Sequence, residues 1–157
     1  MNFQAAFQSR WTVVQTILKL IFRHPICGVV IIPVLEDGRI VLVRRRDNDC
    51  WGLPGGMVDW GEDILTSLHR ELKEETGLQV QRVGRMVGVY SSPQRDPRVH
   101  SICVTVEVNV SGQFCIEDHR EISEVQAFMP SHIPYDALAH DHSQQLTDYW
   151  RGSTVLA

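Results

Sequence analysis

Five stretches rich in aliphatic and β-branched residues predict the strands of a sheet. Residues 28–35 are almost continuously aliphatic, which is typical of a strand buried on both faces, and residues 36–38 read as a hairpin turn. Apolar and polar positions alternate along residues 101–110, as expected for a strand with one buried face. The remaining strands are predicted at residues 39–45, 80–90 and 122–125.

Two helices are predicted between and after these strands. In the first, Leu65, Leu68 and Leu72 recur at helical spacing and predict a stripe that packs on the core, and Gly77 ends the helix. The second is predicted over residues 135–150 and closes the chain. The last few residues are expected to be loose.

Residues 1–24 carry a separate helical pattern, and Pro25 breaks it. The uncharged run within this pattern is too short for the ~20 residues that a membrane-spanning helix needs. An amphipathic helix is therefore predicted, which packs on the domain's own core, forms a homodimer contact or lies on a membrane surface. Residues 25–157 form the main domain. The apolar positions of the pattern are Phe3, Phe7, Trp11, Val14, Leu18, Ile21 and Phe22.

Composition narrows the class of protein. A chain of 157 residues suits one domain with a core of ordinary size. The net charge of −4 gives no electrostatic reason to expect nonspecific nucleic-acid binding. Neither the four cysteines nor the histidines follow a zinc-binding spacing, and no stretch resembles a secretion signal. A cytoplasmic protein with reduced cysteines is expected.

Acidic residues gather on one face of the first predicted helix. Glu71, Glu74 and Glu75 stand at i, i+3 and i+4, so three carboxylates share that face. Such a cluster repels itself at neutral pH unless a cation lies on it. Carboxylate oxygens are hard ligands, which favours Mg²⁺ or Mn²⁺ shared with a phosphate-bearing substrate. The alternative is a solvated acidic face paired with nearby Lys or Arg.

The residues around this cluster favour the metal site. Residues 56–78 fit the pattern G-x5-E-x7-R-E-U-x-E-E-x-G-U, in which U is a bulky aliphatic residue, and they resemble the signature of the Nudix hydrolases. The resemblance implies an α/β (α+β) fold, the Nudix-type αβα sandwich with a mixed central sheet, and divalent-metal hydrolysis of a pyrophosphate bond. The fixed positions are filled by Gly56, Glu62, Arg70, Glu71, Leu72, Glu74, Glu75, Gly77 and Leu78.

The same resemblance assigns roles to the residues of the motif. Glu71 and Glu75 would be the main metal ligands, and Glu74 would be a further ligand or a base. Glu62 would support the metal site, and Arg70 would orient the glutamates.

Two contributions are expected from outside the motif. Residues 51–56 read as a rigid turn, and by the resemblance the backbone oxygen of Gly55 would join the metal shell. An acidic residue on the loop before the last strand would act as a ligand or general base. Glu121 is the candidate, with Glu117 behind it.

Residues 91–100 (SSPQRDPRVH) form a cation-rich loop that suits a ligand with phosphate and hydroxyl groups. The alternative is a surface loop held by Arg–Asp pairing. Pro93 lies 15 residues beyond Leu78, and this position, like the R-D-P-R-x-H run, resembles the ADP-ribose pyrophosphatase group of the family. A further phosphate contact is assigned to Arg44, which could instead pair with a nearby Asp. The expected substrate-binding residues of the loop are Pro93, Arg95, Asp96, Arg98 and His100.

Three functions remain open at this stage. The first is hydrolysis of ADP-ribose to AMP and ribose 5-phosphate by a water that Glu121 or Glu74 helps to deprotonate. The second is another Nudix activity, on nucleoside triphosphates, oxidised ones included, or on NADH. The third is a nucleotide-sensing module without turnover, which the complete set of glutamates argues against.

Overall fold

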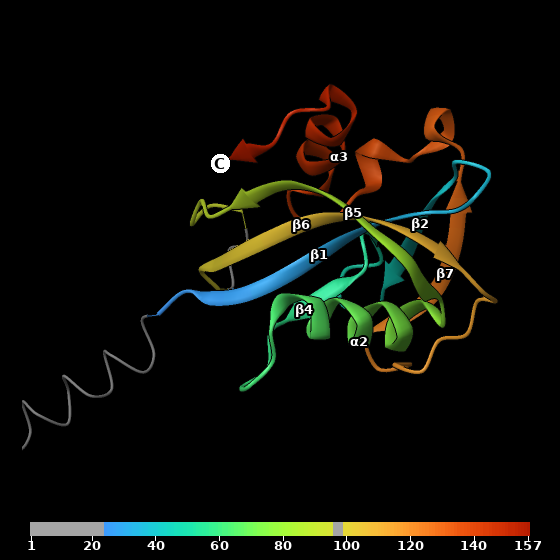
Figure 1. The fold of residues 1–157 in the computed structure, drawn as a ribbon, viewed down its shortest axis with the longest axis horizontal. Helices are drawn as coiled ribbons and strands as arrows, with labels where there is room; N and C mark the ends of the chain where they lie inside the picture. Colours follow the sequence, from blue (N-terminus) through green and yellow to red (C-terminus); the bar gives the residue numbers. More distant parts are fainter. Residues whose placement is uncertain (1–23, 96–98) are drawn as a thin grey trace, which may run out of the picture.

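The structure, a computed structural model, describes residues 24–95 and 99–157 (Figure 1). The predicted N-terminal helix therefore lies outside the described residues, and so do its predicted contacts. Within the described part, no helix is long and apolar enough to cross a membrane.

Among the described residues, eight strands form one mixed sheet in the order β3-β2-β1-β6-β5-β8, with β4 paired to β1 and β7 paired to β2 (Figure 1). The central pair, β1 and β6, is parallel, and every other pair except β5–β8 is antiparallel. The strands are β1 (Ile26–Val34), β2 (Ile40–Arg45), β3 (Trp51–Gly52), β4 (Gly55–Met57), β5 (Gln79–Tyr90), β6 (Ser101–Ser111), β7 (Ile122–Phe128) and β8 (Val155–Leu156).

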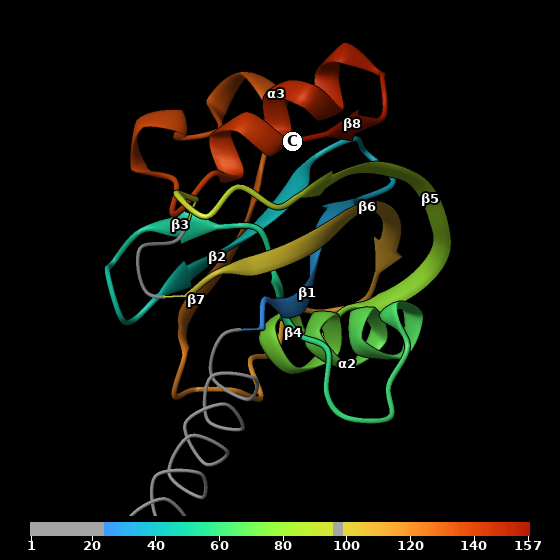
Figure 2. The same cartoon turned by 90° about the vertical axis from the view of Figure 1, so that its left-hand side faces the viewer.

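One helix covers each face of the sheet: α2 (Ile64–Thr76) lies on one side and α3 (His142–Arg151) on the other (Figure 2). Because side chains alternate along a strand, β1 supplies both cores. Val29 and Ile31 belong to the cluster that contains the buried leucines of α2, whereas Val30 and Ile32 belong to the cluster beneath α3. This arrangement confirms the predicted αβα sandwich.

The segment after β2 returns to the middle of the sheet. β3 pairs with Val43 and Arg44 of β2, and β4 pairs with residues 28–30 of β1. Residues 51–56 were expected to form only a turn, and this was wrong, because their backbone groups complete the sheet between β1 and β2. As a result, Gly55 and Gly56 lie against β1 immediately before α2 begins.

Three other expectations were wrong in detail. Leu65, in the first turn of α2, is 50% exposed, and the core stripe of this helix is formed by Leu68 and Leu72. The last helix begins only at His142, because His140 adopts a left-handed conformation (φ 53°) that a right-handed helix excludes. The chain end is not loose, since β8 pairs with the edge strand β5.

Candidate active site

Helix α2 fixes the direction of the acidic residues. The Asp63 carboxylate accepts a hydrogen bond from the Thr66 N–H (2.7 Å) and caps the helix start, and Gly77 (φ 73°) ends the helix as predicted. Burial of Leu68 and Leu72 against the sheet sets the rotation of the helix. The glutamates on the neighbouring face then point toward β4 and the start of β1.

Arg70 connects the helix to the loop that precedes it. Its Nε and Nη2 donate to the two carboxylate oxygens of Glu62 (both 2.9 Å), and Nη2 also donates to the Met57 carbonyl (3.0 Å). Its Nη1 donates to Glu71 (2.6 Å) and approaches Glu74 at 3.5 Å. One guanidinium therefore holds the loop and two glutamates in fixed relative positions.

The carboxylate of Glu62 is fully used inside this network. Besides Arg70, it accepts hydrogen bonds from the Ser67 hydroxyl (2.6 Å) and the Asp59 N–H (3.3 Å). The hydrogen bonds from Arg70 and Ser67 lower the pKa of Glu62 to about 2. Glu62 thus contacts the site through Arg70. Ser67, the hydroxyl donor to Glu62, is fully buried.

Glu75 and Glu71 are held close to backbone atoms at the floor of the site. Glu75 is 3% exposed and accepts a hydrogen bond from the Gly55 N–H (2.9 Å), and burial raises its pKa to about 8. Burial also raises the pKa of Glu71, although Arg70 opposes the shift. A Cβ at Gly56 would overlap the Glu71 carboxylate, so only glycine permits this approach. Gly55 contributes its N–H here, and the metal contact of its oxygen stays a prediction.

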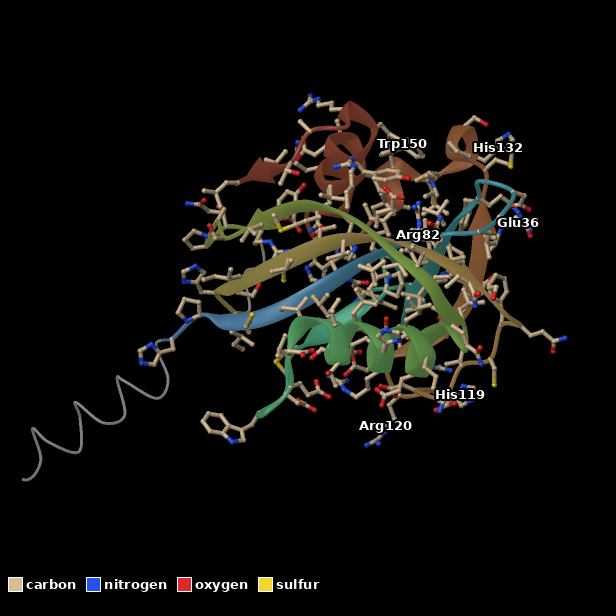
Figure 3. The ribbon with its side chains drawn as sticks, viewed as in Figure 1. Glu36, Arg82, His119, Arg120, His132 and Trp150 are labelled. Atoms are coloured by element: carbon tan, nitrogen blue, oxygen red, sulfur yellow. The ribbon has the colours of Figure 1, made fainter. Side chains whose placement is uncertain are left out.

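A cavity of about 500 Å³ opens here and is lined by Gly55, Gly56 and Glu71, whereas the buried Glu75 does not line it. Glu71 and Glu74 line it from α2, and Asp118 and Glu121 line it from the loop between β6 and β7. This loop is tied to α2, because the Asp118 N–H donates to the Glu74 carbonyl (2.9 Å). Figure 3 shows the loop, marked by its labelled residues His119 and Arg120, passing below α2. Glu121 therefore faces the same cavity as glutamates that lie far from it in sequence.

The donor set fits a hard divalent cation. Buried carboxylates are unfavourable as anions, and a divalent ion removes this penalty while using oxygen ligands. Glu71 and Glu75 are such carboxylates, and Glu74 and Glu121 add oxygens at the cavity wall. No three His, Cys, Asp or Glu side chains of the described part are already gathered closely enough to form a metal site. Side-chain rotation would have to bring the ligands together.

Of the expected substrate-binding residues, Arg95 lines the cavity and Arg44 does not. Arg44 pairs with Asp49 (2.9 Å) and lies over the ring of Trp51, 5.9 Å from its centroid. Its neighbour Arg45 reaches the cavity instead, because successive strand residues point to opposite faces.

The rest of the predicted loop gives a mixed outcome. Pro93 and His100 are exposed and are not among the residues that line the cavity. The His100 ring nitrogen Nε2 lies 3.0 Å from the Ser91 carbonyl, which closes the loop on itself. Asp96 and Arg98 lie outside the described residues, so their substrate contacts stay predictions.

Sequence reasoning missed several cavity residues. Arg45 could have been chosen over Arg44 from the alternation of the strand, and Asp118 from its position near Glu121. Nothing in the local sequence pointed to His140, which lines the cavity, or to Asp141, which binds Arg95. Both precede α3 and meet the site only through the tertiary fold.

Comparison with known proteins agrees with this geometry. The NUDIX domain family matches residues 25–149. The chain belongs to the Nudix family. Among similar proteins, an ADP-ribose pyrophosphatase of Methanocaldococcus jannaschii is 37% identical over 135 residues, which cover 83% of this chain and 76% of the relative. A putative 8-oxo-dGTP diphosphatase of Bacillus subtilis is 29% identical over 126 residues, 80% of either chain.

Solved structures share the Nudix fold of this protein. A MutT NUDIX hydrolase from Burkholderia pseudomallei superposes with a TM-score of 0.70 at 26% identity, covering 80% of this chain and 98% of the other. The NUDIX domain of Shewanella oneidensis NrtR, solved as a complex with ADP ribose, gives a TM-score of 0.74 at 24% identity, covering 84% and 90%. The predicted membership of the Nudix hydrolases is confirmed, with ADP-ribose pyrophosphatases among the relatives.

Proposed function

We propose that this Nudix hydrolase cleaves the pyrophosphate bond of ADP-ribose into AMP and ribose 5-phosphate with the help of Mg²⁺ or Mn²⁺. The observation that carries the proposal is the convergence of Glu71 and Glu74 from α2 with Glu121 from a separate loop on one cavity, above the buried Glu75. The choice of ADP-ribose is supported by the 37% identical ADP-ribose pyrophosphatase.

Glu71 and Glu75 would hold the divalent ions, with Glu74 as a further ligand. Ions in this position would offset the negative charge of the two phosphates and make water more acidic. The cavity walls are suited to this role, because five carboxylates line the cavity and the substrate itself carries two negative charges. They are Asp59, Glu71, Glu74, Asp118 and Glu121. Without a cation, mutual repulsion would keep the substrate out.

The protein's own groups handle the proton and the alignment. Glu121 accepts the proton of the water that attacks phosphorus, and Glu74 is the alternative base on the same cavity wall. Arg70 keeps Glu71 and Glu74 in place while Glu62 fixes Arg70. Arg45, whose Nε and Nη2 donate to Asp47 (both 3.0 Å), brings a positive charge to the cavity wall, which the expected Arg44 does not line.

A second candidate function is hydrolysis of a nucleoside triphosphate, which the 29% identical putative 8-oxo-dGTP diphosphatase favours. The acidic residues serve both reactions, because each breaks a phosphoanhydride bond. The two candidates differ in the group that occupies the remainder of the cavity.

Turnover with a panel of substrates separates the candidates. The purified protein would be given Mg²⁺ with ADP-ribose, NADH, ADP-glucose, a diadenosine polyphosphate, dGTP or 8-oxo-dGTP, and products would be separated by chromatography. The proposal expects the highest kcat/KM with ADP-ribose and AMP as a product. A preference for dGTP or 8-oxo-dGTP would assign a nucleoside triphosphate as the substrate in place of ADP-ribose. Binding without turnover of any compound would support the sensing module.

A further inference from the structure

The cavity has a second region, on the α3 face of the sheet, whose character differs from that of the acidic region. Val30 and Leu53 line it from the core beneath α3, and Cys103 packs against the same core. Ser101 and Arg95 complete this wall. Hydrocarbon, hydroxyl and thiol groups therefore lie beside the guanidinium of Arg95. This region, lined by Val30, Leu53, Arg95, Ser101 and Cys103, is called the Arg95 region below.

Arg95 has little hydrogen-bonding capacity left for a ligand. Its Nε and Nη2 donate to the two oxygens of Asp141 (both 2.9 Å), and its Nη1 donates to Ser101 Oγ (2.7 Å) and Cys103 Sγ (3.1 Å). These contacts use four of the five N–H groups of an arginine. At most one N–H group remains, so Arg95 cannot form the two parallel hydrogen bonds by which arginine clamps a phosphate.

The charge of Arg95 is compensated as well. Its side chain is 7% exposed and forms an ion pair with Asp141. Burial opposes the charge of Arg95, but the hydrogen bonds and the electrostatic attraction of Asp141 and Cys103 together outweigh burial and raise the pKa of Arg95. A compensated guanidinium attracts a phosphate far less than a free one does. It still offers a rigid donor to a neutral oxygen or nitrogen.

A buried chain of hydrogen bonds holds this pair in place. Gln145 Nε2 donates to Asp141 (2.9 Å), and its Oε1 accepts a hydrogen bond from the Thr105 hydroxyl (2.8 Å). Gln145 and Thr105 are fully buried. Gln145 thereby connects Asp141 to both α3 and β6, and Asp141 in turn fixes the position of Arg95. Such support from behind a binding residue keeps the site preorganised.

We propose that the Arg95 region binds the uncharged part of the substrate, a sugar hydroxyl or a base nitrogen or oxygen, while the phosphates occupy the acidic region. The proposal rests on the function proposed above and refines it. Arg95 is a specificity residue that donates one hydrogen bond to the ligand. Asp141 is a positioning residue that acts through Arg95.

Binding measurements test this division of the cavity. Calorimetry would compare ADP-ribose with inorganic pyrophosphate, which lacks any uncharged part, using Ca²⁺ in place of Mg²⁺ to suppress hydrolysis. The variants are Arg95→Lys, which keeps the charge, and Asp141→Asn, which keeps the shape. Arg44→Lys, an arginine paired outside the cavity, is the matched control. Circular dichroism and thermal unfolding would establish that each variant is folded at the assay temperature.

Arg95→Lys and Asp141→Asn are each expected to weaken ADP-ribose binding about tenfold, as for one lost hydrogen bond. In the same two variants, the affinity for pyrophosphate should change by no more than about twofold. Arg44→Lys should change the affinity for neither ligand. In turnover, Asp141→Asn should raise KM about tenfold and leave kcat within about twofold, a split that general loss of folded protein would not produce.

Other results would overturn the proposal. Equal weakening of both ligands would place Arg95 on phosphate, and no weakening of either would remove it from the binding site. Failure of the proposed function is distinct from these results: ADP-ribose would then bind without being hydrolysed, and the binding ratios would still decide the subsite.

Discussion

The two faces of the sheet differ in how far the protein compensates the charge of their ionisable residues. On the α2 face, burial raises the pKa values of the buried Glu75 and of the half-buried Glu71, so the protein compensates their negative charge only in part, although Arg70 pairs with Glu71. On the α3 face, burial opposes the charge of Asp141, but the hydrogen bonds and the positive charge of Arg95, together with the hydrogen bond from Gln145, lower its pKa. The protein itself compensates the charge of Arg95 and Asp141 on the α3 face, whereas the carboxylates on the α2 face would be compensated by a bound cation.

This difference separates carboxylates whose charge a bound cation would compensate from charged residues that the protein itself compensates. A buried charge without a partner is costly, and a protein keeps it only where a ligand completes it. The α3 face also holds His142, whose Nδ1 accepts a hydrogen bond from the Leu53 N–H (3.0 Å). Changes on the α2 face should therefore alter catalysis, and changes at His142 should alter stability.

The largest effect is expected from Glu71→Gln or Glu75→Gln. Each substitution removes one negative charge and keeps the side-chain shape, so folding should persist while kcat falls about 10³-fold. Turnover of ADP-ribose under saturating Mg²⁺ measures this loss. Glu36→Gln is the control, because Glu36 lies at the β1–β2 hairpin, away from α2 (Figure 3), and should leave kcat unchanged. Normal turnover by either folded variant of Glu71 or Glu75 would contradict the proposed site.

A smaller effect is expected from Arg70→Lys. Lysine keeps the positive charge but cannot hold Glu62, Glu71 and the Met57 carbonyl at the same time. We expect kcat to fall about 30-fold, in the range observed when residues that orient metal ligands are changed. Steady-state kinetics with a titration of Mg²⁺ would also show a weaker apparent affinity for the ion. An unchanged Mg²⁺ dependence would mean that Arg70 supports only the loop.

The acidic face was largely predictable from the sequence. Nine positions at fixed spacing define the motif, and helical geometry alone gathers three of its glutamates on one face. The presence of a core on each face of the sheet could also be predicted, because β1 is aliphatic on both faces. These features depend on local periodicity, which a single sequence contains.

The Arg95 region was not predictable in the same way. Arg95 and Asp141 are 46 positions apart and meet only when α3 packs on the sheet. The pairing of β8 depends on free backbone groups at the edge of β5. Contacts distant in sequence decided each of these cases.

The smallest effect is a pH dependence of stability that arises from His142. Burial lowers the pKa of His142 to about 3 from its ordinary value of 6.5, although the neighbouring Asp141 opposes the shift. At pH 7.5 the imidazole is neutral in both states. At pH 5.5 the unfolded chain binds a proton at His142 and the folded chain does not, so the fold loses about 1.4 kcal/mol from this group.

Urea unfolding at pH 7.5 and 5.5 would measure this loss. His142→Asn keeps an acceptor for the Leu53 N–H and cannot titrate, so its stability should fall less between the two pH values, by about 1.4 kcal/mol. His132→Asn, at an exposed histidine (Figure 3), should keep the wild-type dependence. Asp141 remains ionised over this interval because its pKa is lowered, so it does not contribute. An equal pH dependence in wild type and His142→Asn would mean that His142 is protonated in the folded state at pH 5.5. The positive charge of His142 would then have to be compensated by another group on the α3 face.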